Sequence, residues 1–151
     1  MLTSAYFRLM VFLDKFRSLS PLIFRLLLVW GFYEPAMNKL QNPAAIMEWF
    51  SEMGLPFPWL QTWLAIITEC AGCLLLFFGL GTRIIVVPLI IVLLVAIKKV
   101  HLENGFSAAN NGYEIPFYYL LMLISLLLTG SGKFSLDYLL NRKMSYRKDF
   151  P

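Results

Sequence analysis

The sequence predicts an all-α protein, in which four transmembrane helices form a bundle and short amphipathic helices lie at the membrane interfaces. Of its 151 residues, 59% are hydrophobic and 15% are charged, and the mean hydropathy is +0.68. Soluble domains average about half apolar and about a quarter charged residues, so this composition indicates a membrane protein. Four apolar blocks stand out, at residues 22–40, 59–80, 84–97 and 115–129. A span needs roughly 20 residues, and the last two blocks reach that length only if polar flanking residues are included, up to His101 for the third block and from Gly112 for the fourth.

Basic residues predict the orientation of this bundle. Four spans put both termini on one side, and that side holds nine of the thirteen lysines and arginines: Arg8, Lys15, Arg17, Arg83, Lys133, Arg142, Lys143, Arg147 and Lys148. Such residues accumulate in cytoplasmic segments, so both termini are predicted to be cytoplasmic. The net charge of +4 then reflects placement in a lipid bilayer and argues against nucleic-acid binding. We divide the chain into an interfacial N-terminal helix (1–19), a four-helix membrane domain (20–140) and a basic cytoplasmic tail (141–151).

The segments around the spans have recognisable signals. Residues 4–17 mix apolar and basic side chains, as does a helix lying on a membrane surface. Pro21 suits the start of the first span, and Pro35 should loosen its outer end. In the next loop Asn42 can cap a short amphipathic helix that ends at Gly54; we interpret it as an interfacial anchor over the outer mouth, with a mobile lid as the alternative. A tight turn at 79–83, a turn-rich loop at 101–114 and an amphipathic tail at 134–140 complete the chain.

Glu69 is the most informative residue, because it is the only charged residue between Leu55 and Leu80. A carboxylate at the centre of a membrane helix costs roughly 2.5–3.5 kcal/mol, so it usually faces a partner or a polar cavity. Ten residues separate Glu69 from the interfacial Trp59, which places the carboxylate about 15 Å deep. The other three spans contribute further polar groups to this outer half: Glu34, Asn38, Lys39, Lys98, Lys99, His101 and Glu114. Such a pocket could bind a polar headgroup or relay protons; alternatively, the charges only neutralise one another and fix helix packing.

Three more charged residues belong to the inner half. Arg25 lies one turn inside the first span, Arg83 follows the inner turn, and Asp137 follows the last span. We predict that these residues form structural charge pairs, with Asp137 as the partner of Arg25.

Sulfur and imidazole ligands are sparse. Cys70 and Cys73 lie deep in a continuous helix, where they lack the exposed helix N-terminus of reactive thiol motifs, so helix packing is the preferred interpretation. His101 is the only histidine, and no metal-ligand spacing is present, so no metal site is predicted.

The order of these motifs resembles the DoxX family. The likeness runs from about residue 20 to 140 and rests on Arg25, Asn38-Lys39-Leu40, Gly54-Leu-Pro-Phe-Pro58, Thr68-Glu69, Gly79-Leu-Gly-Thr-Arg83, His101-Leu-Glu-Asn-Gly105, Asn111-Gly112 with Glu114, and Gly130-Ser-Gly-Lys-Phe-Ser-Leu-Asp137. The chain is most similar to the HvfX-like subgroup, which is encoded beside copper-inducible modified peptides. A short external loop at 106–110 departs from many members of that subgroup.

The resemblance implies a multi-pass protein of the bacterial inner membrane. It also suggests a redox role, because some family members are membrane subunits of redox systems such as thiosulfate:quinone oxidoreductase. Our first hypothesis is a redox subunit whose outer pocket binds a quinone or another small headgroup. Glu69 and Glu34 would handle protons as catalytic residues, and the ligand would contact Asn38, Lys39, Lys98, His101, Asn104 and Glu114.

The alternative is a non-catalytic scaffold or maturation partner for soluble redox enzymes or metal-binding modified peptides. A small transporter is a third hypothesis, although four spans without a visible inverted repeat are few for alternating access. The sequence leaves open whether the protein is an enzyme, which cofactor it uses and whether it forms a homo-oligomer.

Overall fold

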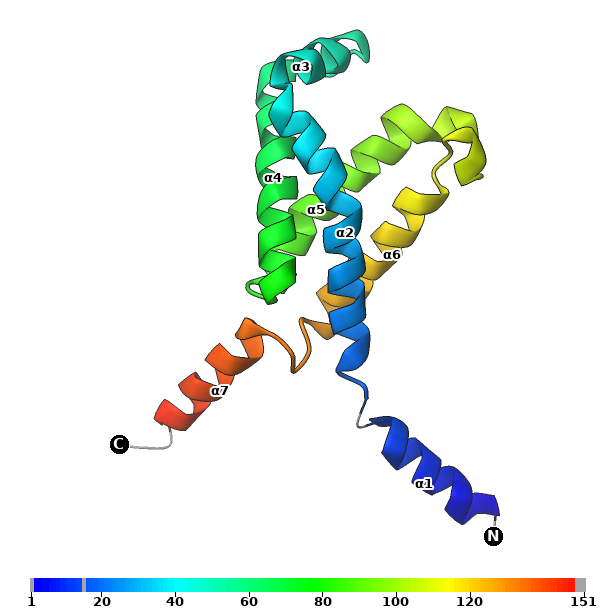
Figure 1. Ribbon diagram of the computed structural model, residues 1–151, viewed down its shortest axis with the longest axis vertical. Coiled ribbons are helices and arrows are strands. Elements are labelled where there is room, and N and C mark those ends of the chain that lie inside the picture. The colour runs from blue at the N-terminus through cyan, green and yellow to red at the C-terminus, as the bar shows by residue number, and fades with distance from the viewer. Residues whose placement is uncertain (1, 15, 149–151) are drawn as a thin grey trace.

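The computed structural model describes residues 2–14 and 16–148, and the regular elements in these ranges are all helical (Figure 1). In chain order they are α1 (Leu2–Asp14), α2 (Leu19–Gln41), α3 (Pro43–Glu52), α4 (Pro58–Phe78), α5 (Thr82–Ala96), the π-helical turn η1 (Ile97–His101), the 3-10 turns η2 (Leu102–Asn104) and η3 (Ala108–Asn110), α6 (Glu114–Thr129) and α7 (Leu136–Lys148). The all-α prediction is therefore confirmed.

Two helical stretches are long and apolar enough to cross a membrane: Pro58–Phe78 and the continuous run Thr82–Asn104. α6 is apolar but has only 16 residues, which is about 24 Å against the roughly 30 Å of a hydrocarbon core. α2 has 23 residues but includes three charged side chains, Arg25, Glu34 and Lys39. Two of the four predicted spans thus meet the criteria of length and composition.

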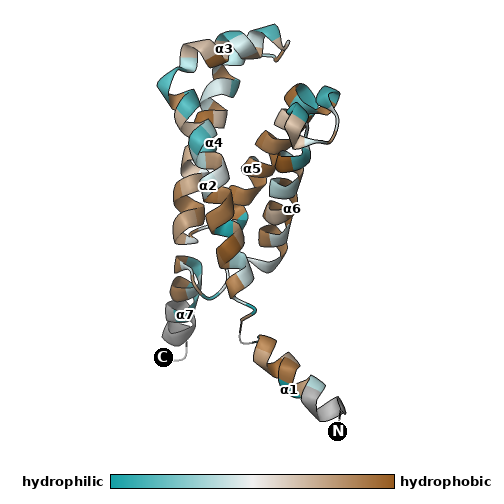
Figure 2. Cartoon of the chain, turned by 45° about the vertical axis from the view of Figure 1, so that its right-hand side comes forward, coloured by the Kyte–Doolittle hydropathy of each residue, from teal (hydrophilic) through white to brown (hydrophobic). Residues whose placement is uncertain are grey.

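Four long helices form a ring. α2 packs beside α4, α5 packs beside α6, and the contacts of α4 with α5 and of α2 with α6 close the ring. The fully buried core comes from the halves of these helices that lie nearest to α7, and includes Leu28, Leu76, Val86, Leu89, Leu123 and Leu126. We call this end of the bundle the inner end and the opposite end, at α3 and η1–η3, the outer end. Figures 1 and 2 show that the α2/α4 pair and the α5/α6 pair meet at the inner end and diverge toward the outer end.

Two glycines allow the helices to approach closely at mid-bundle. A Cβ atom on Gly72 of α4 would lie 2.9 Å from the methyl groups of Leu89 of α5. A Cβ atom on Gly31 of α2 would overlap the ring of Tyr119 of α6, and the ring centroids of Tyr119 and Phe32 are 6.1 Å apart. Small residues at such positions permit helix packing without a steric penalty, so these contacts join the two pairs inward of the outer half.

The inner end is held by bonds from charged side chains to the main chain, not by the predicted ion pair between Arg25 and Asp137. Arg25 is completely buried, and its guanidinium donates to the carbonyls of Leu76 (3.2 Å) and Phe134. It therefore ties the end of α4 to the segment before α7. Leu76 belongs to the last turn of α4, where carbonyls lack the regular i+4 donor, and Phe134 lies in the segment between α6 and α7.

Asp137 has a different partner from the one predicted. Its carboxylate accepts from the amides of Gly81 (2.7 Å) and Thr82 (3.1 Å) and so caps the start of α5. Arg83 donates to the carbonyl of Leu128 at 3.0 Å. Each of the three charged residues of the inner half thus bonds to backbone groups.

The shorter helices follow the sequence signals with shifted bounds. The predicted cap of α3 is confirmed, because the amide of Ala45 donates to the side chain of Asn42 at 3.3 Å. α1 ends at Asp14, earlier than the predicted 17, and α7 continues beyond residue 140 because neither glycine nor proline interrupts the sequence there. α1 and α7 both extend away from the inner end of the bundle (Figure 1).

Candidate functional site

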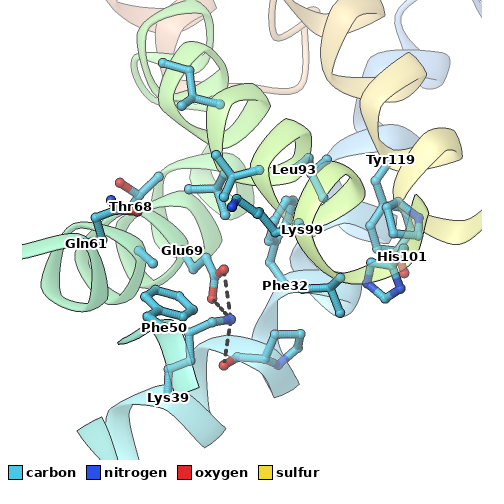
Figure 3. A pocket seen from close by; sticks show the side chains of 18 of the residues that line it. Phe32, Lys39, Phe50, Gln61, Thr68, Glu69, Leu93, Lys99, His101 and Tyr119 are labelled. Atoms are coloured by element: carbon cyan, nitrogen blue, oxygen red, sulfur yellow. Dashed lines mark hydrogen bonds and ion pairs between the residues drawn. The ribbon is translucent and has the colours of Figure 1, made fainter. Parts of the chain in front are cut away.

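A cavity of about 700 Å³ lies in the outer half, between the two diverging helix pairs. All four long helices line it, together with α3, η1 and the loop that precedes α6. Most lining side chains are apolar, and Figure 3 shows the polar exceptions, among them Lys39, Gln61, Thr68, Glu69, Lys99 and His101. A mostly apolar cavity with a few convergent polar groups is the usual form of a small-molecule site.

Glu69 and Lys39 form an ion pair in the wall of this cavity. The ammonium of Lys39 lies 2.8 Å from one carboxylate oxygen of Glu69 and 3.0 Å from the other, and 3.5 Å from the carbonyl of Pro35 (Figure 3). The side chains of Lys39 and Glu69 are 17% and 4% exposed. A buried charge needs a partner and hydrogen bonds to offset its lost hydration, and Lys39 supplies both. The prediction that Glu69 faces a partner is thus confirmed, and the cavity that it also lines is mostly apolar rather than polar.

Each member of the pair is placed by its helix. Glu69 lies on the buried face of α4, in line with Thr62, Ile66 and Leu76 at helical spacing. Lys39 belongs to the last turn of α2, where a basic group also interacts favourably with the helix dipole. The ion pair consequently joins the outer end of α2 to the middle of α4, the two members of one helix pair.

Three residues of the predicted site lie elsewhere. Glu34, Asn38 and Lys98 are exposed and do not line the cavity. Lys99 lines it instead, and its ammonium donates to the carbonyl of Met53, just after α3, at 3.3 Å. Lys99 follows Ile91 and Val95, which also line the cavity, at intervals of four residues, so it continues the inward face of α5 into the π-helical turn at 97–101.

The remaining predicted ligand contacts organise the outer loop. The Nδ1 atom of His101 lies 2.8 Å from the carbonyl oxygen of Asn111, to which the Asn104 amide also donates at 3.2 Å. The carboxylate of Glu114 accepts from the amide of Ala108 at 2.9 Å and from the hydroxyl of Tyr118 at 3.2 Å. Of His101, Asn104 and Glu114, only His101 lines the cavity. Asn104 and Glu114 therefore support the loop that holds it.

Sequence reasoning missed several lining residues. Gln61 lies two turns outward of Glu69 on the same helix, so its helical spacing could have indicated it. Thr68 is adjacent to Glu69, a spacing that does not predict a shared face. Lys99 was counted in the outer half but not chosen as a ligand contact, and Tyr119 gave no signal because its place depends on its contact with Gly31.

The cysteines and the potential metal ligands add no further centre. Cys70 and Cys73 are free thiols, both half-buried, and the Cys73 sulfur lies 3.8 Å from the carbonyl of Val29. Within residues 2–14 and 16–148, no three His, Cys, Asp or Glu side chains gather in a way that could hold a metal ion.

Comparisons with known proteins identify the family of this helical membrane protein. The DoxX family model matches residues 20–102. Over 133 residues the chain is 33% identical to an "Uncharacterized protein" of Haemophilus influenzae, a match that covers 83% of this chain and 85% of that protein. Over 125 residues it is 30% identical to "Putative oxidoreductase CatD" of Bacillus subtilis, a match that covers 83% of this chain and 90% of that protein. No solved structure matches the chain. The chain belongs to the DoxX family of membrane proteins.

Proposed function

We propose that this DoxX family protein is the membrane subunit of a redox complex and that its outer cavity binds a quinone-like headgroup. α2, α4, α5 with η1, and α6 would cross the bacterial inner membrane with both termini in the cytoplasm. Residues 1–19 would then lie on the inner surface, 20–140 would form the membrane domain and 141–151 a basic tail. The bases for this orientation are the excess of lysine and arginine at the inner end and the exit of α1 and α7 from that same end.

α6 is the shortest of these proposed spans. Its 16 residues fall roughly 6 Å short of the hydrocarbon thickness. Local thinning of the bilayer accommodates such a mismatch at a modest cost for each ångström.

The observation that carries the proposal is the Lys39–Glu69 pair in an otherwise apolar cavity. The volume of about 700 Å³ falls within the roughly 300–1,000 Å³ of small-molecule sites. A quinone headgroup is flat and apolar on both faces, and it carries two carbonyl oxygens that accept hydrogen bonds. Apolar walls that include the polar side chains of Lys39, Gln61 and His101 suit that chemistry. The name of the Bacillus subtilis relative, "Putative oxidoreductase CatD", supports a redox reaction.

The proposed chemistry assigns distinct roles to the polar residues. Reduction of a quinone to a quinol consumes two electrons and two protons, and a partner redox protein would supply the electrons. Glu69 would deliver protons to a quinone oxygen, while Lys39, Lys99 and His101 would orient the headgroup. Glu34 and Lys98, which we considered from the sequence, receive no role in the cavity because they lie outside its lining.

The test compares two carboxylate variants with the same chemical change. We expect Glu69→Gln to abolish quinone reduction by membrane vesicles that contain the assembled complex, while the protein still inserts into the membrane. Glu34→Gln is the matched control, because Glu34 is exposed on α2 outside the cavity lining, and it should retain wild-type activity. Wild-type quinone reduction by Glu69→Gln would refute the proposal.

A scaffold function is the second candidate, favoured by the way α1 and α7 extend from the bundle (Figure 1). α1 exposes apolar side chains, including Phe7, Val11 and Phe12, which could contact a partner as well as lipid. In this case the protein would dock soluble enzymes or enzymes that mature metal-binding modified peptides. A stable co-purifying partner, together with a phenotype that is lost with α1 but unaffected by Glu69→Gln, would favour this function.

A further inference from the structure

One side of the outer cavity is bordered by two rows of residues, which we call the lateral rows. Leu64 and Thr68 of α4 form one row, and Ile91 and Val95 of α5 form the other. Within each row the residues are four positions apart, so they lie one above the other on the helix. Leu64, Ile91 and Val95 line the cavity and yet are 54%, 57% and 39% exposed. Residues that line a cavity and also reach the molecular surface border an opening.

The inner limit of this opening is well defined. One turn inward of Thr68, Gly72 of α4 packs against Leu89 of α5 and brings the two helices together. Pro88, which also lines the cavity, has no amide hydrogen for the preceding turn of α5. A proline inside a helix removes one backbone hydrogen bond and favours bending. The α4/α5 contact therefore ends where α5 is easiest to bend, and the rows separate outward from there.

Other routes into the cavity carry bridging contacts. At the outer mouth the bond from Lys99 to the carbonyl of Met53 spans from η1 to the end of α3. On the α2/α6 side, the ring of Tyr119 lies against Gly31. The lateral rows differ from the outer mouth and the α2/α6 side because three of their four side chains are apolar. An exposed apolar surface of a membrane helix contacts the acyl chains of lipids.

We propose that the cavity opens sideways into the bilayer between the lateral rows, and that its ligand is a membrane-dissolved amphiphile with a long apolar tail. The headgroup lies beside Lys39 and Glu69, and the tail passes between α4 and α5 into the lipid. Methylene groups are more stable in lipid than in water. A long tail is therefore held most favourably by an opening that leads to acyl chains. The inference rests on the proposed function and adds the route and the tail to it.

The test narrows the opening and varies the tail. Leu64→Trp and Ile91→Trp each add bulk at one lateral row. Ile67→Trp and Leu94→Trp are matched controls, because Ile67 and Leu94 are 60% and 49% exposed on the same two helices but do not line the cavity. Binding of ubiquinone with one isoprenoid unit and with eight isoprenoid units is measured for each purified protein in lipid nanodiscs.

We expect the two lateral-row variants to weaken binding of the eight-unit quinone at least tenfold and that of the one-unit quinone less than threefold. The two control variants should match wild type for both probes. If Leu64→Trp and Ile91→Trp bind both quinones as wild type does, or weaken both equally, the lateral route is wrong while the quinone site itself stands. If wild type binds neither quinone, the proposed function is wrong and this inference is refuted with it.

Discussion

Removal of Lys39 should destabilise the protein more than neutralisation of Glu69, although the two residues form one ion pair. Lys39→Met leaves a carboxylate that is 4% exposed in the wild type, near the middle of α4. Glu69→Gln leaves an ammonium that is 17% exposed, two residues before the end of α2. A lysine near a helix end can extend its flexible stem to the interface, whereas a glutamate at mid-helix cannot.

The magnitudes follow from this asymmetry. Loss of one partner from a buried ion pair costs about 3–5 kcal/mol when the remaining charge stays buried, and we expect this for Lys39→Met. Glu69→Gln should cost about 1–3 kcal/mol, the usual penalty of a weakened buried hydrogen bond. The double variant Lys39→Met/Glu69→Gln contains neither charge, so it should be more stable than Lys39→Met alone by about 2 kcal/mol, a coupling typical of residues in contact.

The free energy of unfolding can be measured by titrating the purified protein in mixed micelles with dodecyl sulfate, at neutral pH, and following helicity by circular dichroism. Lys98→Met is the matched control, because Lys98 is an exposed lysine of the same outer end, and it should change stability by less than about 0.5 kcal/mol. The reasoning is refuted if Lys39→Met costs no more than Glu69→Gln, or if the double variant is no more stable than Lys39→Met.

Two further predictions concern the inner end. Gly79 has φ +63°, and a Cβ atom there would lie 2.6 Å from the Cβ of Ser135 and would overlap the guanidinium of Arg25. A left-handed backbone alone costs an alanine about 1–2 kcal/mol. Gly79→Ala should therefore lower the free energy of unfolding by more than that amount. Gly54→Ala is its control, because Gly54 has φ +68° but open space around it, and equal losses for the two variants in the same unfolding titration would contradict this account. Asp137→Ala removes the acceptor of two amides at the start of α5 and should cost about 0.5–2 kcal/mol. The same titration should detect that loss, and unchanged stability would show that water replaces the carboxylate.

Sequence patterns predicted the helices well where the signal was local. The cap at Asn42, the proline that follows it and the glycine that ends the segment each act within a few residues, and α3 has the predicted place. Glu69 also gave a local signal, since a lone carboxylate in an apolar membrane helix must face the bundle interior or a cavity. Its partner Lys39 was among the candidates because both residues had been placed in the outer half by counting helical rise.

The incorrect details depend on tertiary contacts. Which face of α5 lines the cavity depends on how α5 packs in the bundle, so Lys98 was the predicted contact, whereas Lys99 lines the cavity in register with Ile91 and Val95. The charge of Arg25 suggested a carboxylate partner. The backbone carbonyls of Leu76 and Phe134 accept from the guanidinium instead, and no composition or spacing rule ranks them against Asp137.

The contacts that hold the bundle together lie at the inner end, whereas the contacts that shape the cavity lie in the outer half. Near the inner end all four long helices share one packed core, and Arg25 and Asp137 bind the main chain there. At the outer end the Lys39–Glu69 bond joins α2 to α4, both within one helix pair. The ion pair therefore stiffens one wall of the cavity without drawing the α5/α6 pair toward it. Because dispersion contacts are lost wherever the walls stand apart, a ligand that touches both walls would restore them, so the outer half is the part of the molecule where binding energy is most readily gained.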